Sequence, residues 1–150
     1  MGQVDVKVRL SKTDVFALLQ HFDDSSDRPL HEGLDFDSYS EKLSNHAFFV
    51  LYHEEGLLLA FIAYYLNYEE NFVYIPQIVV HKKGRHQGVG HQMIEILEKS
   101  LPNSFKVIRL EVLKENIVAY NFYMREGFSE VEDRNERFLL EKKLIKAEES

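Results

Sequence analysis

The sequence contains no cysteine. This absence excludes a disulfide framework, a zinc site built on thiolates and every enzyme class that relies on a cysteine nucleophile. Long apolar runs are also missing, because the longest stretch without a charged residue, Leu57 to Tyr68, is shorter than the roughly 20 residues of a membrane-spanning helix. The segment from Met1 to Leu10 alternates apolar and charged side chains and lacks the apolar centre of a secretory leader. We therefore expect a cytoplasmic protein that does not bind membranes.

Positive charge is also in short supply. The 150 residues carry 25 acidic side chains against 18 lysines and arginines, for a formal charge of −7. Because nucleic-acid binders gain affinity by neutralising phosphates, this balance argues against a nucleic acid as partner. With 45% hydrophobic and 29% charged residues, the composition is that of a globular protein. The length suits a single domain, which we expect to cover residues 1–150.

Hydrophobic spacing predicts a mixed α/β domain in the order β-α-α-β-β-β-α-β-α-β-β. The predicted strands cover residues 4–10, 47–52, 57–66, 72–80, 105–113, 128–132 and 137–144, and the predicted helices cover residues 11–22, 35–45, 89–101 and 116–125. Ser11, Asp35 and Asn116 are typical helix caps. Pro76 cannot donate a hydrogen bond to a sheet, so it marks a bulge or an unpaired edge within the fourth strand.

The most informative segment follows the fourth strand, where residues 81–92 contain no acidic side chain. This segment leads into the start of a helix, where backbone N–H groups without partners and the helix dipole favour an anion such as a phosphate. Gly88 and Gly90 let the backbone approach the anion closely. Four basic side chains add positive charge around it: Lys82, Lys83, Arg85 and His86. The alternative is a solvated loop with a flexible helix cap.

Two other phosphate-binding loops fit this spacing poorly. A Walker loop requires a lysine after its second glycine, where this chain has Val89. A Rossmann fingerprint requires a third glycine, where this chain has Met93. Nucleotide hydrolysis and hydride transfer are therefore not favoured.

The pattern Arg85-x-x-Gly88-x-Gly90, which follows a strand and opens a helix, resembles the acyl-CoA-binding motif of the GNAT superfamily of N-acetyltransferases. A second block resembles the later helix of that family and the strand after it: Asn116-x-x-Ala119-x-x-Phe122-Tyr123-x-x-x-Gly127-Phe128. The resemblance covers residues 72–144 well, and the element order extends it over nearly the whole chain. It implies a mixed α/β fold whose mostly antiparallel central sheet is splayed between strands 4 and 5 and flanked by about four helices. Residues 1–67 would then form mainly the acceptor side, and residues 72–144 mainly the acyl-CoA side.

The resemblance also implies an activity, the transfer of an acetyl group from acetyl-CoA to an amine by direct attack, with no metal. The implied acyl-CoA contacts are Ile78, Val79, Val80, Arg85, His86, Gln87, Gly88, Val89, Gly90, Asn116 and Tyr123. Ile78 and Val80 would hold the pantetheine arm, and residues 85–90 would wrap the pyrophosphate. A backbone N–H at Val79 or Val80 would polarise the thioester carbonyl, so Val80 is a predicted catalytic residue.

Tyr123 is the predicted general acid, because a phenol with a reference pKa of ~10 keeps its proton at neutral pH and can pass it to a departing thiolate. The alternative is a tyrosine that only fills the core, and Asn116 has a similar alternative as a helix cap. The general base stays open. Many family members carry Glu or Asp on the fourth strand, where this chain has Pro76 and Gln77. The candidates are Tyr74, His81, Glu54 and a water held by Gln77.

The acceptor is expected to be a small-molecule or peptide amine. The stretch from Asp23 to Glu41 is rich in acidic residues and would attract a cationic amine, although helix capping and solvation are the alternative. His81, His86 and His91 are spaced too far apart to share a helical face, so no metal site is predicted. Two other functions stay open, an acyl-CoA sensor without turnover and a transferase of another acyl group or to an oxygen acceptor. Exposed strand edges would allow a homodimer.

Overall fold

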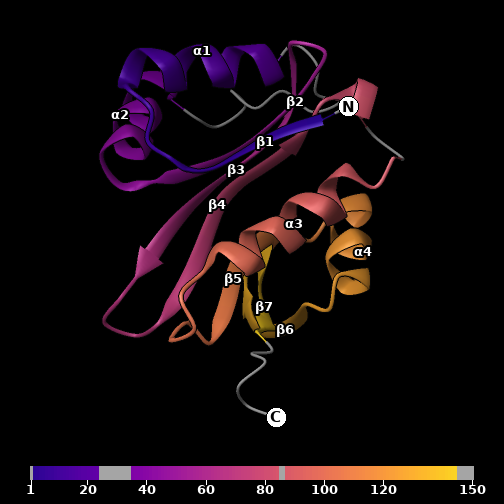
Figure 1. Cartoon of the computed structure of the whole chain (residues 1–150). Coiled ribbons are helices and arrows are strands. Elements are labelled where there is room, and N and C mark those ends of the chain that lie inside the picture. Colours follow the sequence, from indigo (N-terminus) through magenta and orange to yellow (C-terminus); the bar gives the residue numbers. More distant parts are fainter. Residues whose placement is uncertain (1, 24–34, 85–86, 145–150) are drawn as a thin grey trace. The chain divides into compact units, whose positions relative to one another are not determined.

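A computed structural model describes residues 2–23, 35–84 and 87–144 of the chain (Figure 1). The chain divides into two compact units, the first formed by residues 1–64 and 77–100 and the second by residues 65–76 and 101–150. The third and fourth strands contribute to both units, and every other element belongs to one.

Every element predicted from hydrophobic spacing is present, with ends shifted by at most two residues. The helices are α1 (Lys12–Asp23), α2 (Phe36–His46), α3 (Val89–Ser100) and α4 (Ile117–Arg125), and a short 3-10 turn, η1, covers Lys82–Gly84. The strands are β1 (Gly2–Val8), β2 (Phe48–Glu54), β3 (Leu57–Asn67), β4 (Phe72–Val80), β5 (Val107–Leu113), β6 (Ser129–Arg134) and β7 (Arg137–Lys143). Within the described ranges, no helix is long and apolar enough to cross a membrane. The η1 turn was not predicted.

The strands follow the order β1-β2-β3-β4-β5-β7-β6. The pairs β1–β2, β2–β3, β5–β7 and β6–β7 are antiparallel, whereas β4 and β5 are parallel. The final hairpin therefore places its second strand, β7, between β5 and β6. This arrangement confirms the predicted mixed α/β fold with a mostly antiparallel sheet.

The pairing of β4 with β5 is short. It joins Phe72–Ile75 of β4 to Val107–Leu110 of β5, although β4 continues to Val80. The residue after the last pair is Pro76, whose nitrogen carries no hydrogen, so a hydrogen-bond ladder cannot continue through it. The strand edge predicted at Pro76 thus coincides with the end of the β4–β5 pairing, as a sheet splayed between strands 4 and 5 requires.

In the first unit, α1 buries one apolar face. The buried residues recur at helical spacing: Val15, Leu18, Leu19 and Phe22. The Phe22 ring meets Phe61 of β3 with 5.1 Å between ring centroids. The predicted cap is confirmed, because the Ser11 hydroxyl accepts a hydrogen bond from the Asp14 amide at 3.1 Å. Helices α1 and α2 lie on one side of β1–β3, and α3 lies on the other (Figure 1).

In the second unit, β5 separates an apolar side from a polar one. Ile108 and Leu110 are buried on one side, where the Tyr120 ring of α4 also contacts Phe138 of β7 at 5.8 Å between ring centroids. The turn between β6 and β7 differs slightly from the prediction. Arg134 pairs with Arg137, so the turn is formed by residues 135 and 136 instead of 133–135.

Helix α2 contains a buried polar group. Its predicted cap is confirmed, since the Asp35 carboxylate accepts hydrogen bonds from the Asp37 and Ser38 amides at 3.0 and 3.5 Å. One turn further along, Ser40 is fully buried, and its hydroxyl has no hydrogen-bond partner among the described residues. A buried hydroxyl without a partner loses its hydration and gains nothing in return.

Replacing this hydroxyl by hydrogen should therefore stabilise the protein. We expect Ser40→Ala to raise the free energy of unfolding by about 1 kcal/mol, measured by urea denaturation. Ser38→Ala on the same helix removes a hydroxyl that donates to the Asp35 carboxylate at 3.0 Å, and it should bring no gain. A Ser40→Ala variant less stable than the parent would show that the hydroxyl has a partner.

Candidate functional site

The basic segment after β4 is held in shape by its own side chains. The His81 carbonyl accepts a hydrogen bond from the Gly84 amide at 2.8 Å, which closes the η1 turn. The Nδ1 atom of His81 accepts a second from the Lys83 amide at 3.1 Å, and the Gln87 side chain donates to the Lys83 carbonyl at 3.2 Å. These three hydrogen bonds stabilise a defined turn in the described part of the segment. Arg85 and His86, two predicted ligands, lie outside the described residues.

The start of α3 has the features of an anion site. Gly88 has φ of +74°, and a side chain there would be strained although nothing lies within 4 Å of where its Cβ would stand. The Gly88 carbonyl accepts the helical hydrogen bond from Gln92 at 3.0 Å, so Val89 and Gly90 belong to the first turn, where the helix offers their amides no acceptor. The Val89 side chain is buried, which leaves its backbone as the part that could meet a ligand. These donors suit a phosphate group.

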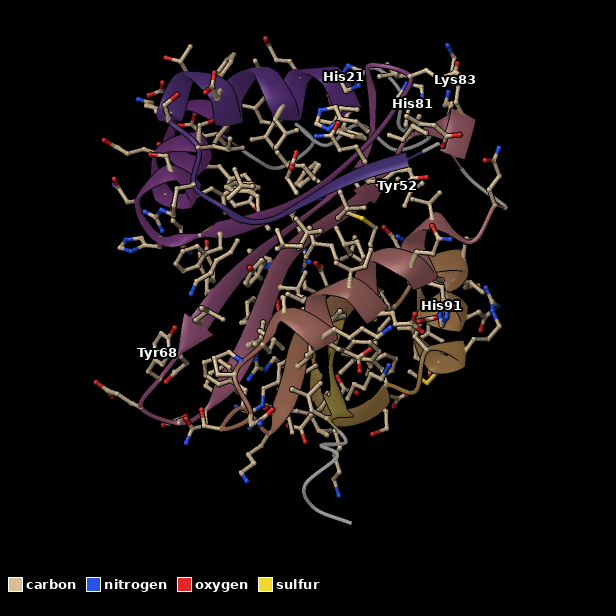
Figure 2. The ribbon with its side chains drawn as sticks, in the orientation of Figure 1. His21, Tyr52, Tyr68, His81, Lys83 and His91 are labelled. Carbon is tan, nitrogen blue, oxygen red and sulfur yellow. The ribbon has the colours of Figure 1, made fainter. Side chains whose placement is uncertain are left out.

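Two histidines stack beside this turn. The rings of His21, from α1, and His81 lie 5.6 Å apart between centroids, with an angle of 30° between their planes (Figure 2). The Nε2 atom of His21 lies 3.1 Å from the Leu58 carbonyl oxygen, so a neutral His21 with its hydrogen on Nε2 can donate there. Because Nδ1 of His81 already accepts from a backbone amide, that nitrogen is not available as a general base.

The part of β4 assigned to the pantetheine arm belongs to the first unit. Val79 is buried, whereas Ile78 and Val80 are half-buried. Immediately before them, the Gln77 side-chain oxygen accepts a hydrogen bond from the Tyr39 hydroxyl of α2 at 3.2 Å. An amide does not accept a proton at neutral pH, so Gln77 could act in proton transfer only through a water, as predicted from the sequence.

Asn116 and Tyr123 lie on α4 in the second unit. The Asn116 side-chain oxygen accepts a hydrogen bond from the Ala119 amide at 3.2 Å, so this residue caps the helix. Tyr123 is 7% exposed, and its ring contacts Phe122 and Phe128 at 5.4 and 5.5 Å between centroids. Burial raises the pKa of the Tyr123 hydroxyl far above its ordinary value, so the group keeps its proton at neutral pH.

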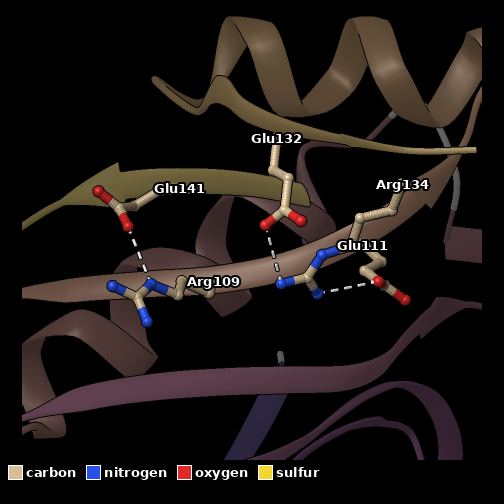
Figure 3. Close-up of polar contacts among 5 residues, drawn as sticks. All are labelled: Arg109, Glu111, Glu132, Arg134 and Glu141. Carbon is tan, nitrogen blue, oxygen red and sulfur yellow. Dashed lines mark hydrogen bonds and ion pairs between the residues drawn. The ribbon is translucent and has the colours of Figure 1, made fainter. Parts of the chain in front are cut away.

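A polar face lies on the side of β5 opposite its buried residues, and it carries a group that the sequence reasoning missed. On this face Arg109 donates to Glu141 at 2.9 Å, and Arg134 donates to Glu111 and Glu132 at 3.1 Å each (Figure 3). Glu111 follows Leu110, the last β5 residue paired with β4. Glu111 therefore stands directly after the end of the β4–β5 pairing. The alternation of apolar and polar residues in β5 predicted the side of the strand on which Glu111 lies. Only the register between β4 and β5 shows that Glu111 follows the end of their pairing.

The remaining candidate bases are less suitable. Tyr74 stacks on Tyr65 with 6.5 Å between ring centroids, and burial, then the charge of Glu111, raises the pKa of its hydroxyl. A phenol with a raised pKa is protonated at neutral pH and cannot accept another proton. Glu54, on β2, accepts a hydrogen bond from the Tyr52 hydroxyl at 3.2 Å. Glu111, in contrast, directly follows the end of the β4–β5 pairing.

Two residues of the acidic stretch serve local structure. Asp35 caps α2, as shown above, and Asp37 pairs with Lys12 of α1 at 3.1 Å. The part of the stretch from 24 to 34 lies outside the described residues. The described part therefore favours the interpretation as helix capping over that of a surface for cationic amines.

The comparison with known families agrees with this fold. The sequence pattern of the acetyltransferase (GNAT) family matches residues 14–128, a range that includes both motif blocks. The chain therefore belongs to the GNAT family of acetyltransferases, a class of acyltransferase enzymes. No curated protein sequence matches the chain significantly.

Solved structures share the fold. The PaiA N-acetyltransferase of Thermoplasma acidophilum, in complex with coenzyme A, matches with a TM-score of 0.74 at 20% identity, over 94% of this chain and 99% of that chain. The ribosomal-protein-S18-alanine N-acetyltransferase of Escherichia coli matches with a TM-score of 0.76 at 18% identity, over 98% and 96%. An acetyltransferase of Thermus thermophilus gives 0.76 at 18%, over 95% and 97%. At these identities the likeness defines the fold.

Proposed function

We propose that the protein is an acetyl-CoA-dependent N-acetyltransferase that moves the acetyl group to an amine by direct attack. The observation that carries this proposal is the start of α3, where a glycine with positive φ and first-turn amides follow a strand that has lost its parallel partner. Backbone amides of this kind can bind a pyrophosphate without help from side chains. Membership of the family supports the same assignment.

Each part of acetyl-CoA has a proposed set of ligands in this chain. The backbone of Gly88, Val89 and Gly90 would bind its pyrophosphate, and Arg85, His86 and Gln87 are proposed as further ligands. Ile78 and Val80 would hold the pantetheine arm, and Asn116 and Tyr123 are assigned to the same co-substrate. Bound acetyl-CoA supplies an acetyl group activated as a thioester. A backbone N–H at Val79 or Val80 is proposed to donate toward the carbonyl oxygen of that group.

Two groups of the second unit are proposed to handle protons. Tyr123 keeps its proton because its hydroxyl is buried, and it would give that proton to the thiolate that leaves. A raised pKa makes a phenol a weaker acid, but desolvation raises the pKa of a thiol in the same surroundings as well. Glu111, whose carboxylate lies 3.1 Å from the Arg134 guanidinium, would take the proton that an alkylammonium must lose before it attacks.

Both compact units are proposed to form one acetyltransferase domain. An acyl-CoA sensor without turnover is the alternative from another class, and it needs the co-substrate contacts but neither Tyr123 nor Glu111. A transferase of another acyl group, or one that acts on an oxygen acceptor, would use the same residues. A thiol-release assay with several acyl-CoAs and amines distinguishes these alternatives.

Binding of the co-substrate can be measured without turnover. At a hundredfold excess over its Kd, acetyl-CoA should add about 2.7 kcal/mol to the free energy of unfolding and raise Tm by roughly 5–10 °C. Arg85→Glu should abolish the rise in Tm, because it places a negative charge beside the pyrophosphate. Lys106→Glu, the matching change at an exposed residue of the second unit, should leave it intact. An unaltered rise in Arg85→Glu would contradict the assignment of the pyrophosphate to this loop.

The role of Tyr123 separates an enzyme from a sensor. Tyr123→Phe should lower kcat by about 10² to 10⁴-fold, because it removes the proton donor and keeps the ring. KM for acetyl-CoA and the rise in Tm should be retained. Tyr68→Phe makes the same change at a residue that is 60% exposed, and it should leave kcat unaltered. A Tyr123→Phe variant with normal kcat would show that the tyrosine only fills the core.

The role of Glu111 appears in the pH profile. Glu111→Gln should lower kcat/KM for an alkylamine about 10²-fold at pH 7, and the loss should shrink as the pH rises toward the pKa of the amine, where the acceptor no longer needs a base. Glu141→Gln removes the charged partner of Arg109 on the same face and should have a small effect. Equal losses in both variants, independent of pH, would indicate a structural role for the two carboxylates.

A further inference from the structure

One of the two polar atoms in the Gln77 side-chain amide, the oxygen, already takes part in a hydrogen bond. Its Oε1 atom accepts a hydrogen bond from the Tyr39 hydroxyl at 3.2 Å, in a contact that is partly buried. Tyr39 is itself fixed near the start of α2, where its amide donates to the Asp35 carbonyl at 2.9 Å. The orientation of the Gln77 amide is therefore set from α2, with the Nε2 atom on the end away from the tyrosine hydroxyl.

The Nε2 end of Gln77 is a donor that has no acceptor among the described residues. The residue is half-buried, so its side chain remains within reach of a ligand. Nε2 is not one of the fully buried polar atoms that lack a partner, so it is open to solvent and a ligand oxygen can take the place of water there. Gln77 also directly precedes Ile78–Val80, the part of β4 that the proposed function assigns to the thioester arm.

The chemistry of this donor selects a class of acceptor. A carboxylate at this position would attract a second ammonium group, as in a diamine. An amide whose oxygen is occupied offers only N–H, and an N–H group pairs with an oxygen that has a lone pair. A second ammonium has no lone pair to offer, and a plain alkylamine has no second polar group at all.

We propose that Gln77 is a specificity-determining residue that binds a carbonyl oxygen next to the amine being acetylated. The acceptor would then be an α-amino carbonyl compound, such as an amino-acid amide or a peptide with a free amino terminus. Tyr39 acts as a positioning residue, because its hydroxyl holds the Gln77 amide in the orientation that presents Nε2. This inference rests on the proposed function and narrows its acceptor.

The test compares matched acceptors with the full chain and acetyl-CoA. Alaninamide, isopropylamine and 1,2-diaminopropane share the reacting amine on the same branched carbon and differ in whether they carry a carboxamide, nothing or a second amine. The quantity measured is the ratio of kcat/KM for alaninamide to that for isopropylamine. Its change between variants cancels the different basicities of the two amines.

In Gln77→Met, which keeps the length of the side chain and removes the amide, the ratio should fall about five- to tenfold. KM for acetyl-CoA should not change. Tyr39→Phe should lower the same ratio by a smaller factor, because the amide can then rotate, and it provides a second reading should Gln77→Met fail to fold. Gln20→Met makes the same exchange at an exposed residue of α1 and should leave the ratio unaltered.

Three outcomes would overturn the inference. A ratio that Gln77→Met leaves unaltered while turnover persists contradicts it and leaves the acetyltransferase proposal standing. A preference of the parent protein for 1,2-diaminopropane that Gln77→Met abolishes would show that Gln77 presents its oxygen instead. No transfer to any of the three amines by the parent protein would contradict the proposed function itself, and the inference with it.

Discussion

The missing amide hydrogen of Pro76 is the constraint on which the rest of the site depends. It ends the parallel pairing of β4 with β5 after four residue pairs, although both strands continue. The residues that follow on β4 are thereby released from the role of ladder partners for β5 and become available to shape a site. Gln77, directly after the proline, takes its hydrogen bond from α2, and His81, directly after the strand, organises the turn that leads to α3.

Local signals in the sequence were sufficient for the elements, because a cap or a helical face depends on residues a few positions apart. Ser11, Asp35 and Asn116 cap the helices that they were expected to cap. The position of β7 between β5 and β6 depends on pairing over long distances, which no local pattern encodes. Glu111 was missed for the same reason, because its position relative to β4 follows from the long-range register between β4 and β5.

The site residues differ in how far they could be predicted. Gly88 at the start of α3 is recognisable because glycine adopts positive φ without strain, and the spacing of glycines is a sequence property. The hydrogen bond between Tyr39 and Gln77 joins residues 38 positions apart and can only be seen once the chain is folded. The two proposed proton carriers depend on surroundings in the same way, since burial raises the pKa of Tyr123 and the fold brings Arg134 to within 3.1 Å of Glu111.

The outer strand β6 has a consequence for self-association. All six of its residues are exposed, and Glu130, Glu132 and Asp133 stand against a single Arg134. A second copy that extended the sheet at this margin would align carboxylates with carboxylates, and the repulsion would oppose such a union. Among the described strands β6 ends the sheet, and its acidic residues disfavour extension of the sheet by a second copy along this strand.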